Sequence, residues 1–400
     1  MILSKSTTVL IATFSPWKNG KRLPINGNLE PMLDFFSKKV GKTVLIDQVY
    51  PGSDFVLPRV EIHKNGKMKL IKPSLLVSLL SPILKLSNTD ATHTIFKIRD
   101  FLSVLTCPKN KEAYDVFIGF ECVNAVAGIV LRKFGKVKKV IYYVSDYTPK
   151  RYANPLFNSA YLWLDRFAAE NSDYVWDVSK AMLPARQKEG YKGKTDHIMH
   201  VPNALYTSQL CWKEEKDIEE KSLVFMGTLG KENGPDLAIE TLPLVLKKIK
   251  GTTLHIVGGG REGELLSLAK KLKVEKNVVF HGFVGDRKGV SDLISQYSIS
   301  LAPYRNFKGS ARLYGDATKI RAYTAAGLPV ITTFVPPLGE EIEQANAGIR
   351  VRDNNKDFSE AIVKVLNDKK LYRSLRKNAI EFARNNTWEN VYRKAFKDMK

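Results

Sequence analysis

One stretch decides the fold class: Tyr314-Gly-Asp-Ala-Thr-Lys-Ile-Arg-Ala-Tyr-Thr-Ala-Ala-Gly-Leu-Pro-Val-Ile-Thr-Thr333. It predicts a loop followed by a helix, because Asp316 or Thr318 can accept hydrogen bonds from the first helical turn. Gly327 predicts the helix end, and the β-branched run from Val330 predicts a buried strand. A loop, a helix and a short strand in this order form the repeating unit of an α/β protein.

Lys319 falls in the first turn of this predicted helix. A cation there is unfavourable for the helix dipole. The position is explained if an anion, such as a diphosphate, binds between the helix N-terminus and the ammonium group. The alternative is an ordinary helix–strand unit with a solvated lysine, and the spacing alone does not separate the two interpretations.

The alternation of short apolar strands and helices extends over the whole chain in two runs. Residues 206–221 separate the runs, because they have no apolar period and end in a series of charges. The predicted segments are therefore 1–205, 206–221 as a linker, 222–385 and a final helix at 386–400. We predict an α/β fold with two Rossmann-like, doubly wound domains facing a cleft.

Composition places the chain among soluble globular proteins of about two domains, with 400 residues, 44% hydrophobic and 26% charged. The net charge of +22 is spread over both halves and favours anionic partners such as nucleotides, phosphorylated lipids or a membrane surface. A role in solubility alone is the alternative. We expect no nucleic-acid partner, because no nucleic-acid-binding module is recognisable.

Cysteine and histidine usage predicts neither disulfides nor a metal site. The three cysteines form no CxxC pair, and the six histidines show no metal-binding spacing. We therefore expect a reducing, cytoplasmic location and no cofactor. The N-terminus has the pattern of a first strand and not that of a signal peptide, and no apolar run reaches the length of a membrane span.

Residues 71–86 are apolar and carry basic neighbours, namely Lys67, Lys69, Lys72 and Lys85. Such a segment could rest on the inner face of an anionic membrane as a peripheral attachment, or cover an apolar acceptor. An ordinary pair of core-facing helices is the alternative.

Two glycine-rich loops follow strands in the second half. Gly227–Gly234 allows backbone amides to approach an oxygen-rich ligand, and Lys231 can add charge. Gly258–Gly263 formally matches the GxGxxG dinucleotide pattern. The acidic residue of that fingerprint is missing, because the next strand ends in His281-Gly282-Phe283, which instead offers backbone and an aromatic face to a base.

Polar groups also follow strands in the first half. Glu121 comes after one strand, and Asp146, Lys150 and Arg151 come after the next. They suit a polar or phosphorylated acceptor, whereas the alternative is a surface cluster of salt bridges. The polar loop at residues 15–28 follows the first strand and is a further candidate for ligand binding.

Residues 222–390 resemble the donor domain of GT-B-fold retaining nucleotide-sugar glycosyltransferases of family 4 type. The most specific part is Asp316–Thr333, which is similar to the pattern DPTKIREYxAxGLPVITT. In the first half, Tyr143–Tyr152 and Asp173–Asp177 resemble a subset of these enzymes. The resemblance implies an acceptor-binding first domain, a donor-binding second domain and a C-terminal helix that crosses back to the first domain.

The resemblance also implies site residues. Donor binding is expected of Gly227, Thr228, Lys231, Asn233, Gly258, His281, Gly282, Phe283, Tyr304, Thr318, Lys319, Ile320 and Ala322. Acceptor binding is expected of Asn26, Gly27, Asn28, Lys150, Arg151 and Tyr152. The catalytic candidates are Lys319, Asp316, Glu121 and Asp146, with Lys319 stabilising the leaving diphosphate and the sugar near Asp316.

The chain departs from the family pattern at four positions. The family often has arginine where this chain has Thr228, lysine where it has Asn233 and a strand-end histidine where it has Phe120. Ala322 stands where the pattern has a glutamate that contacts the donor.

Two functional hypotheses follow. The first is a retaining, hexosyltransferase-like enzyme (EC 2.4) that moves a sugar from a nucleoside-diphosphate sugar to a glycan, lipid-linked or other cleft-bound acceptor in polysaccharide or glycoconjugate biosynthesis. The alternative is a catalytically impaired, nucleotide-sugar-binding pseudoenzyme or a scaffold subunit of a glycosylation complex.

Overall fold

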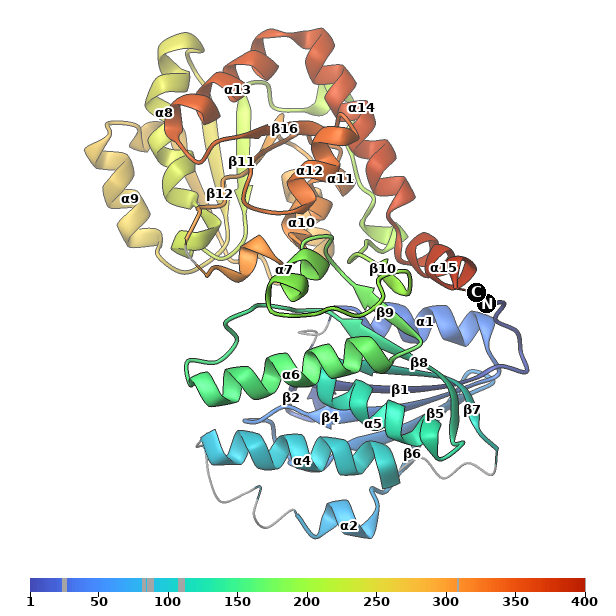
Figure 1. Cartoon of the computed structure of the whole chain (residues 1–400). Coiled ribbons are helices and arrows are strands. Elements are labelled where there is room, and N and C mark those ends of the chain that lie inside the picture. Colours follow the sequence, from blue (N-terminus) through green and yellow to red (C-terminus); the bar gives the residue numbers. More distant parts are fainter. Residues whose placement is uncertain (24–26, 81–83, 85–89, 107–111, 308, 400) are drawn as a thin grey trace. The chain divides into compact units, whose positions relative to one another are not determined.

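The computed structural model describes residues 1–23, 27–80, 84, 90–106, 112–307 and 309–399, without the side chains of 90–94 and 287. The chain forms two compact units (Figure 1). The first contains residues 1–202 and 391–400, and the second contains residues 203–390. The segment boundaries expected from the sequence, at 205/206 and 385/386, lie near these positions.

The first unit is built on an eight-stranded sheet with the order β10-β9-β8-β7-β1-β4-β5-β6. Its strands are β1 (Thr8–Ser15), β4 (Lys42–Val49), β5 (Arg59–Lys64), β6 (Lys67–Ile71), β7 (Tyr114–Phe120), β8 (Val137–Val144), β9 (Tyr174–Asp177) and β10 (Ile198–His200). The pairs from β10 to β4 are parallel, whereas β5 and β6 extend the sheet in antiparallel fashion. A turn at Asn65 and Gly66 joins β5 to β6, and both residues have positive φ, as a tight hairpin turn requires.

Helices cover the first sheet. They are α1 (Leu29–Lys39), α2 (Leu75–Ser78), α4 (Asp90–Thr106), α5 (Glu121–Lys133), α6 (Pro155–Asn171) and α7 (Met182–Lys188). Helices α4, α5 and α6 pack side by side (Figure 1). The last helix, α15 (Trp388–Asp398), packs on α1 through the stacked rings of Phe35 and Phe396. A two-stranded hairpin of β2 (Trp17–Lys18) and β3 (Lys21–Arg22) follows β1.

The second unit is built on a six-stranded, fully parallel sheet with the order β13-β12-β11-β14-β15-β16. Its strands are β11 (Ser222–Met226), β12 (Thr253–Val257), β13 (Val278–Gly282), β14 (Ile299–Ala302), β15 (Val330–Thr333) and β16 (Gly348–Val351). Most strand residues are buried, as in a sheet covered on both faces.

Two helical layers cover this sheet. One apolar core joins it to α8 (Pro235–Lys248), α9 (Glu262–Lys271) and α13 (Asn355–Asn367). The other joins it to α10 (Arg287–Ile294), α11 (Thr318–Ala325), α12 (Leu338–Gln344) and α14 (Lys369–Asn385). Short 3₁₀ turns are η1 (Thr207–Gln209), η2 (Glu215–Asp217), η3 (Lys231–Asn233), η4 (Glu275–Asn277) and η5 (Ala311–Leu313). The sequence patterns do not predict α12.

Residues 206–221, which the sequence assigns to a linker, lie within the second unit. The Cys211 amide donates to the Ala325 carbonyl oxygen at 3.0 Å, and the Glu219 amide donates to the Gln296 carbonyl oxygen at 2.8 Å. These bonds attach the segment to the ends of α11 and α10. The segment lacks an apolar period because it covers these helix ends and forms only the short 3₁₀ turns η1 and η2, with no α-helix or strand of its own.

Strand order fixes where each sheet can bind a ligand. In the second unit the chain passes from β11 to β12 and β13 on one side, and then returns to β14 on the other side. The loops after β11 and β14 therefore leave in opposite directions, and ligands of open α/β sheets bind beside the carboxyl ends of such strands. Strands β1 and β7 have the same relationship in the first unit. Among the described helices, none has the length and apolar character needed to cross a membrane.

Candidate active site

Lys319 lies at the carboxyl ends of β11 and β14. Its Nζ is 4.4 Å from the ring centroid of Phe225 and 4.6 Å from that of Tyr304. The side chain is buried, and Nζ has no hydrogen-bond acceptor among the residues that the structure describes. Burial, and then the nearby positive charge of Arg312, lower the pKa of Lys319 to about 7. A buried ammonium without an acceptor is costly, so this group is arranged to receive an anion.

Three glycines bring the strand-end loops of the second unit together. A Cβ atom on Gly227 would lie 3.3 Å from Lys319 Nζ, so Gly227 leaves the space above the ammonium open. A Cβ atom on Gly258 would lie 1.9 Å from the Gly227 carbonyl oxygen, which excludes any side chain there. The Gly258 amide donates to the Gly282 carbonyl oxygen at 2.8 Å. The predicted donor-binding positions Gly227, Gly258 and Gly282 therefore meet at one edge of the sheet.

The helix start differs from the sequence-based expectation. The N-cap of α11 is Ala317, and no side chain caps the helix. Asp316 does not cap it because its carboxylate is used elsewhere. Arg321 donates to it at 2.9 to 3.1 Å, and the Asn203 amide donates to it at 2.8 Å. The capping role predicted for Asp316 or Thr318 is therefore wrong.

The same pairing limits what Asp316 can do chemically. Its side chain is 1% exposed, and that of Arg321 is 2% exposed. Breaking a buried pair of this kind leaves an uncompensated charge. The geometry favours Asp316 as a brace for the first turn of α11 and not as a group that contacts a sugar.

The remaining candidates on α11 divide between the core and the surface. Thr318 and Ala322 lie one helical turn apart and are the two positions of α11 that are not buried. Ile320 is fully buried in the apolar core, so its side chain is not available to a ligand. The open face of α11 therefore carries a threonine and an alanine beside the buried Lys319.

The loop after β11 is held by its own side chains. Asn233 Nδ2 donates to the Thr228 carbonyl oxygen at 2.9 Å and contacts Thr228 Oγ1 at 2.6 Å. Asn233 is buried, whereas Thr228 and Lys231 are exposed. Asn233 thus shapes the loop, and Lys231 is the exposed cation that the loop itself offers.

His281 on β13 is part of a ring cluster with His255 on β12 and Tyr297, which follows α10. Its Nε2 lies 3.1 Å from His255 Nδ1 and 3.2 Å from the Tyr297 hydroxyl oxygen. Burial lowers the pKa of both histidines. The adjacent Phe283 is 81% exposed, so its ring is the group of this segment that a base could stack on.

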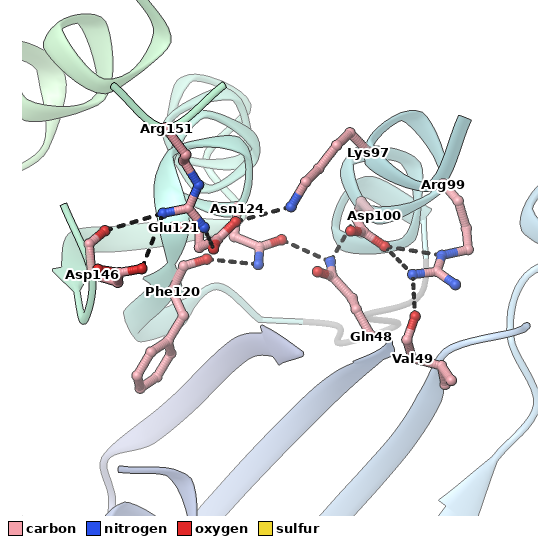
Figure 2. Close-up of polar contacts among 10 residues, drawn as sticks. All are labelled: Gln48, Val49, Lys97, Arg99, Asp100, Phe120, Glu121, Asn124, Asp146 and Arg151. Atoms are coloured by element: carbon pink, nitrogen blue, oxygen red, sulfur yellow. Dashed lines mark hydrogen bonds and ion pairs between the residues drawn. The ribbon is translucent and has the colours of Figure 1, made fainter. Parts of the chain in front are cut away.

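Glu121 opens helix α5 at the carboxyl end of β7 in the first unit. Figure 2 shows its carboxylate between Lys97 and Arg151, whose nitrogens lie 2.9 Å and 2.7 Å away. Burial raises the pKa of Glu121, but the two cations outweigh burial and hold it below its usual value. Its φ is +64°, a conformation that is unfavourable for glutamate. A carboxylate held ionised in this way cannot act as a general acid near neutral pH.

The other candidates of the first unit surround this group. Arg151 Nη1 lies 3.5 Å from the Asp146 carboxylate, and the side chain of Asp146 is 60% exposed. The Arg151 and Tyr152 amides both donate to Asn158 Oδ1, which fixes the loop between β8 and α6. Lys150 and Tyr152 are exposed.

The predicted acceptor loop is only partly accessible. Asn26 lies outside the described residues. Asn28 is buried, and its carbonyl oxygen accepts a hydrogen bond from the Tyr392 hydroxyl group of α15. Gly27 precedes it in a turn. The structure therefore places Asn28 at a contact with α15 inside the first unit.

Sequence reasoning missed several groups. In the second unit, Phe225 and Arg312 contact Lys319 or the Tyr304 ring. In the first unit, Gln48 Nε2 donates to Asn124 Oδ1, and Asn124 Nδ2 donates to the Phe120 carbonyl oxygen (Figure 2). These side chains have no sequence signal, because each acts through a partner distant in the chain. Across the described residues, no group of three or more His, Cys, Asp or Glu side chains could hold a metal ion.

The second unit is similar to known glycosyltransferases. Residues 208–382 match the family model for glycosyl transferases group 1. The chain is 28% identical over 194 residues to the lipopolysaccharide glucosyltransferase WaaG of Escherichia coli K12, a match that covers 46% of this chain and 49% of the relative. It is 24% identical over 249 residues to a GDP-mannose-dependent α-(1-6)-phosphatidylinositol monomannoside mannosyltransferase of Mycobacterium tuberculosis, covering 61% and 57% respectively. The chain thus spans about half the length of these curated relatives.

A solved structure extends the comparison over the whole chain. The crystal structure of HepE from Anabaena in complex with UDP covers 98% of this chain and 99% of its own, with a TM-score of 0.66 at 14% identity. At this identity the similarity shows the fold alone. That fold is GT-B, in agreement with the sequence-based prediction of two Rossmann-like domains.

Proposed function

We propose that this chain is a GT-B glycosyltransferase of the family 4 type and that it moves a sugar from a nucleoside-diphosphate donor to an acceptor. One observation carries the proposal. Lys319 is buried, and its Nζ has no hydrogen-bond acceptor among the described residues. The space next to this nitrogen is left open by Gly227, at the strand ends where α/β sheets bind ligands. The positive charge of Lys319 would offset the charge that develops on the leaving diphosphate.

The first test of the proposal is ligand binding. Isothermal titration with UDP, GDP and dTDP should show binding of at least one diphosphate to the unmodified protein. The variant Lys319→Met is the matched control, because it keeps the length of the side chain and removes its charge. The absence of binding by all three diphosphates would contradict the proposal.

The names of the relatives suggest the reactants. HepE is solved with UDP, and the mycobacterial relative is named for GDP-mannose and a phosphatidylinositol mannoside. WaaG is named for lipopolysaccharide. We therefore propose a uridine or guanosine donor and a glycan or lipid-linked acceptor in glycoconjugate biosynthesis. Incubation with radiolabelled UDP-glucose or GDP-mannose and a lipid extract would identify the pair.

We further propose transfer with retention of the anomeric configuration and without a metal or cofactor. The support is the family resemblance and the position of Lys319, which can supply the charge that a metal ion supplies in other transferases. Proton NMR of the product distinguishes retention from inversion. Turnover that is lost in EDTA and restored by magnesium would contradict a metal-independent reaction.

A second candidate function is that of a nucleotide-sugar-binding pseudoenzyme or a scaffold subunit. It is favoured by Ala322, which occupies the open face of α11 one turn beyond Thr318. An alanine offers a donor sugar no hydrogen bond. Robust turnover by the unmodified chain excludes this candidate, whereas turnover by Ala322→Glu alone supports it.

We also propose peripheral attachment to an anionic membrane through β6 and α2. Residues 64–79 include four lysines and no acidic residue. Met68 on β6 is 54% exposed, Leu75 on α2 is 77% exposed, and Leu79, which directly follows α2, is 65% exposed. Lys85, part of the sequence-based prediction, lies outside the described residues. Apolar side chains among cations are typical of surfaces that bind acidic lipid headgroups.

Vesicle co-sedimentation tests this attachment. Binding should require anionic lipid. Replacing Lys67, Lys69 and Lys72 with glutamine should weaken it by roughly a hundredfold, since each charge near the surface contributes about 1 kcal/mol. The matched control removes the same charge from α9 and the turn after it, at Lys270, Lys271 and Lys276. Equal effects of the two triple variants would show that only net charge matters.

A further inference from the structure

A second cation approaches the same aromatic ring as Lys319. Arg312 lies in η5, and its guanidinium carbon is 6.0 Å from the ring centroid of Tyr304, whereas Lys319 Nζ is 4.6 Å from that centroid. The positive charge of Arg312 disfavours the protonated form of Lys319. Two cations that converge without an anion between them repel each other. An anion bound beside Tyr304 would relieve that repulsion.

Arg312 is loosely held in the absence of such an anion. Among the described residues, Arg312 forms an ion pair only with Glu232, and its Nε lies 3.9 Å from the Glu232 carboxylate. This distance is beyond hydrogen-bond range, and the two side chains are 45% and 50% exposed. Exposed pairs of this kind contribute little to stability. The guanidinium group can therefore leave Glu232 without disturbing the fold.

The charge of a diphosphate exceeds what Lys319 alone can neutralise. The pKa of about 7 leaves Lys319 only partly protonated at neutral pH. An arginine stays protonated there and matches two phosphate oxygens with its planar fork of donors. The contact with Glu232, a residue of η3, brings Arg312 beside the loop after β11, and Arg312 and Lys319 both approach the Tyr304 ring.

We propose that Arg312 is a second diphosphate-binding residue, which exchanges the carboxylate of Glu232 for the phosphate oxygens when the donor binds. This inference rests on the proposed function, because it concerns the same donor site. Glu232 then acts as an internal competitor that lowers donor affinity. The residue that follows, Asn233, fixes the loop that carries this carboxylate.

Isothermal titration of UDP and GDP, and of uridine and guanosine, tests the proposal. Arg312→Gln should weaken binding of the diphosphate at least about tenfold, as expected for a lost charged hydrogen bond, and leave nucleoside binding unchanged. Arg312→Lys should restore part of the affinity. Glu232→Gln should strengthen diphosphate binding severalfold. The matched control is Arg352→Gln, which removes an exposed arginine paired with Asp357 elsewhere in the second unit and should have no effect.

Each outcome of these titrations supports or overturns the proposed role of Arg312. Equal diphosphate affinity in Arg312→Gln and the unmodified protein overturns the inference while the proposed function stands. An equal loss of nucleoside affinity shows a structural role and also overturns it. If Arg312→Gln does not fold, Glu232→Gln decides, because unchanged affinity contradicts competition. If the unmodified protein binds no nucleoside diphosphate, the proposed function and this inference both fail.

Discussion

At the scale of single residues, Lys319 combines three features that seldom occur together: burial, a lowered pKa and the absence of a hydrogen-bond acceptor in the described structure. Burying a cation in this way costs free energy that the fold must supply elsewhere. Residues at ligand-binding positions often lower the stability of the free protein because binding requires them. This cost leads to two predictions for Lys319.

The first concerns stability without ligand. Lys319→Met keeps the contacts with Phe225 and Tyr304 and removes the buried charge, so the unliganded protein should become more stable by roughly 1 kcal/mol. Diphosphate affinity should fall at least about a hundredfold, as expected when a buried charge partner is lost. Urea unfolding and isothermal titration measure the two effects. Lys270→Met, at an exposed position, is the control, and a less stable Lys319→Met would contradict the prediction.

The second concerns pH. The folded-state pKa of Lys319, about 7, lies below its ordinary value of 10.5, so near pH 8 the free site is mostly unprotonated. A bound diphosphate favours the charged form and raises this pKa. Diphosphate binding near pH 8 should therefore take up close to one proton, and affinity should fall as the pH rises above about 7. The same linkage makes this group's contribution to stability increase with pH between 7 and 10.5.

Titration calorimetry in two buffers of different ionisation enthalpy counts the protons taken up. Lys319→Arg is the control, because an arginine remains protonated throughout this range and should abolish the uptake. Proton release on binding, or an unchanged count in Lys319→Arg, would show that another group titrates.

At the scale of elements, the site depends on loops that pack without side chains between them. The amides of Gly227, Leu229 and Gly258 donate to the carbonyl oxygens of Val257, Gly259 and Gly282, at 2.8 to 3.0 Å. These bonds continue from one strand end to the next, from β11 through β12 to β13. The open position above Lys319 is thus a property of three loops together.

Gly258→Ala should disrupt this arrangement. The new Cβ atom would lie 1.9 Å from the Gly227 carbonyl oxygen, and the residue has a φ of +147°. We expect a loss of about 2 kcal/mol or more, together with loss of diphosphate binding. Gly263→Ala is the control: it lies in α9 with no atom within 4 Å of the added Cβ, and it should be neutral or stabilising by up to about 1 kcal/mol. Wild-type stability of Gly258→Ala would contradict the packing argument.

At the scale of the whole molecule, the first unit is completed by the end of the chain. Residues 391–400 belong to it together with residues 1–202. The ring centroid of Phe396 lies 6.0 Å from that of Phe35 and 5.1 Å from that of Trp176. The Met1 amino group donates a hydrogen bond to the Phe396 carbonyl oxygen at 2.9 Å. The core of the first unit therefore contains residues from both ends of the sequence.

Phe396→Ala should destabilise the first unit selectively, by about 3 to 5 kcal/mol, because a buried aromatic ring is replaced by a cavity. Hydrogen exchange should speed up in α1 and β9 and remain slow in the six strands of the second unit. Phe396→Leu is the control and should show a smaller loss. Equal acceleration in both units would show that they unfold as one.

The sequence by itself determined the elements and the fold class. Local patterns suffice for strands such as Tyr114–Phe120 and Ser222–Met226, because a buried parallel strand is a short, continuous apolar run. Lys319 could be singled out because its charge conflicts with its place in the first turn of a helix. Helix α12 was missed because it is only seven residues long.

Tertiary structure alone decided which polar groups are available. Asp316 and Glu121 have the same sequence signature as catalytic acids, yet Arg321 engages the first, and Lys97 and Arg151 engage the second. Arg312 has no signature, and only its approach to Tyr304 draws attention to it. The physical reason is that helix and strand patterns depend on neighbours in sequence, whereas the charge and accessibility of a side chain depend on neighbours in space.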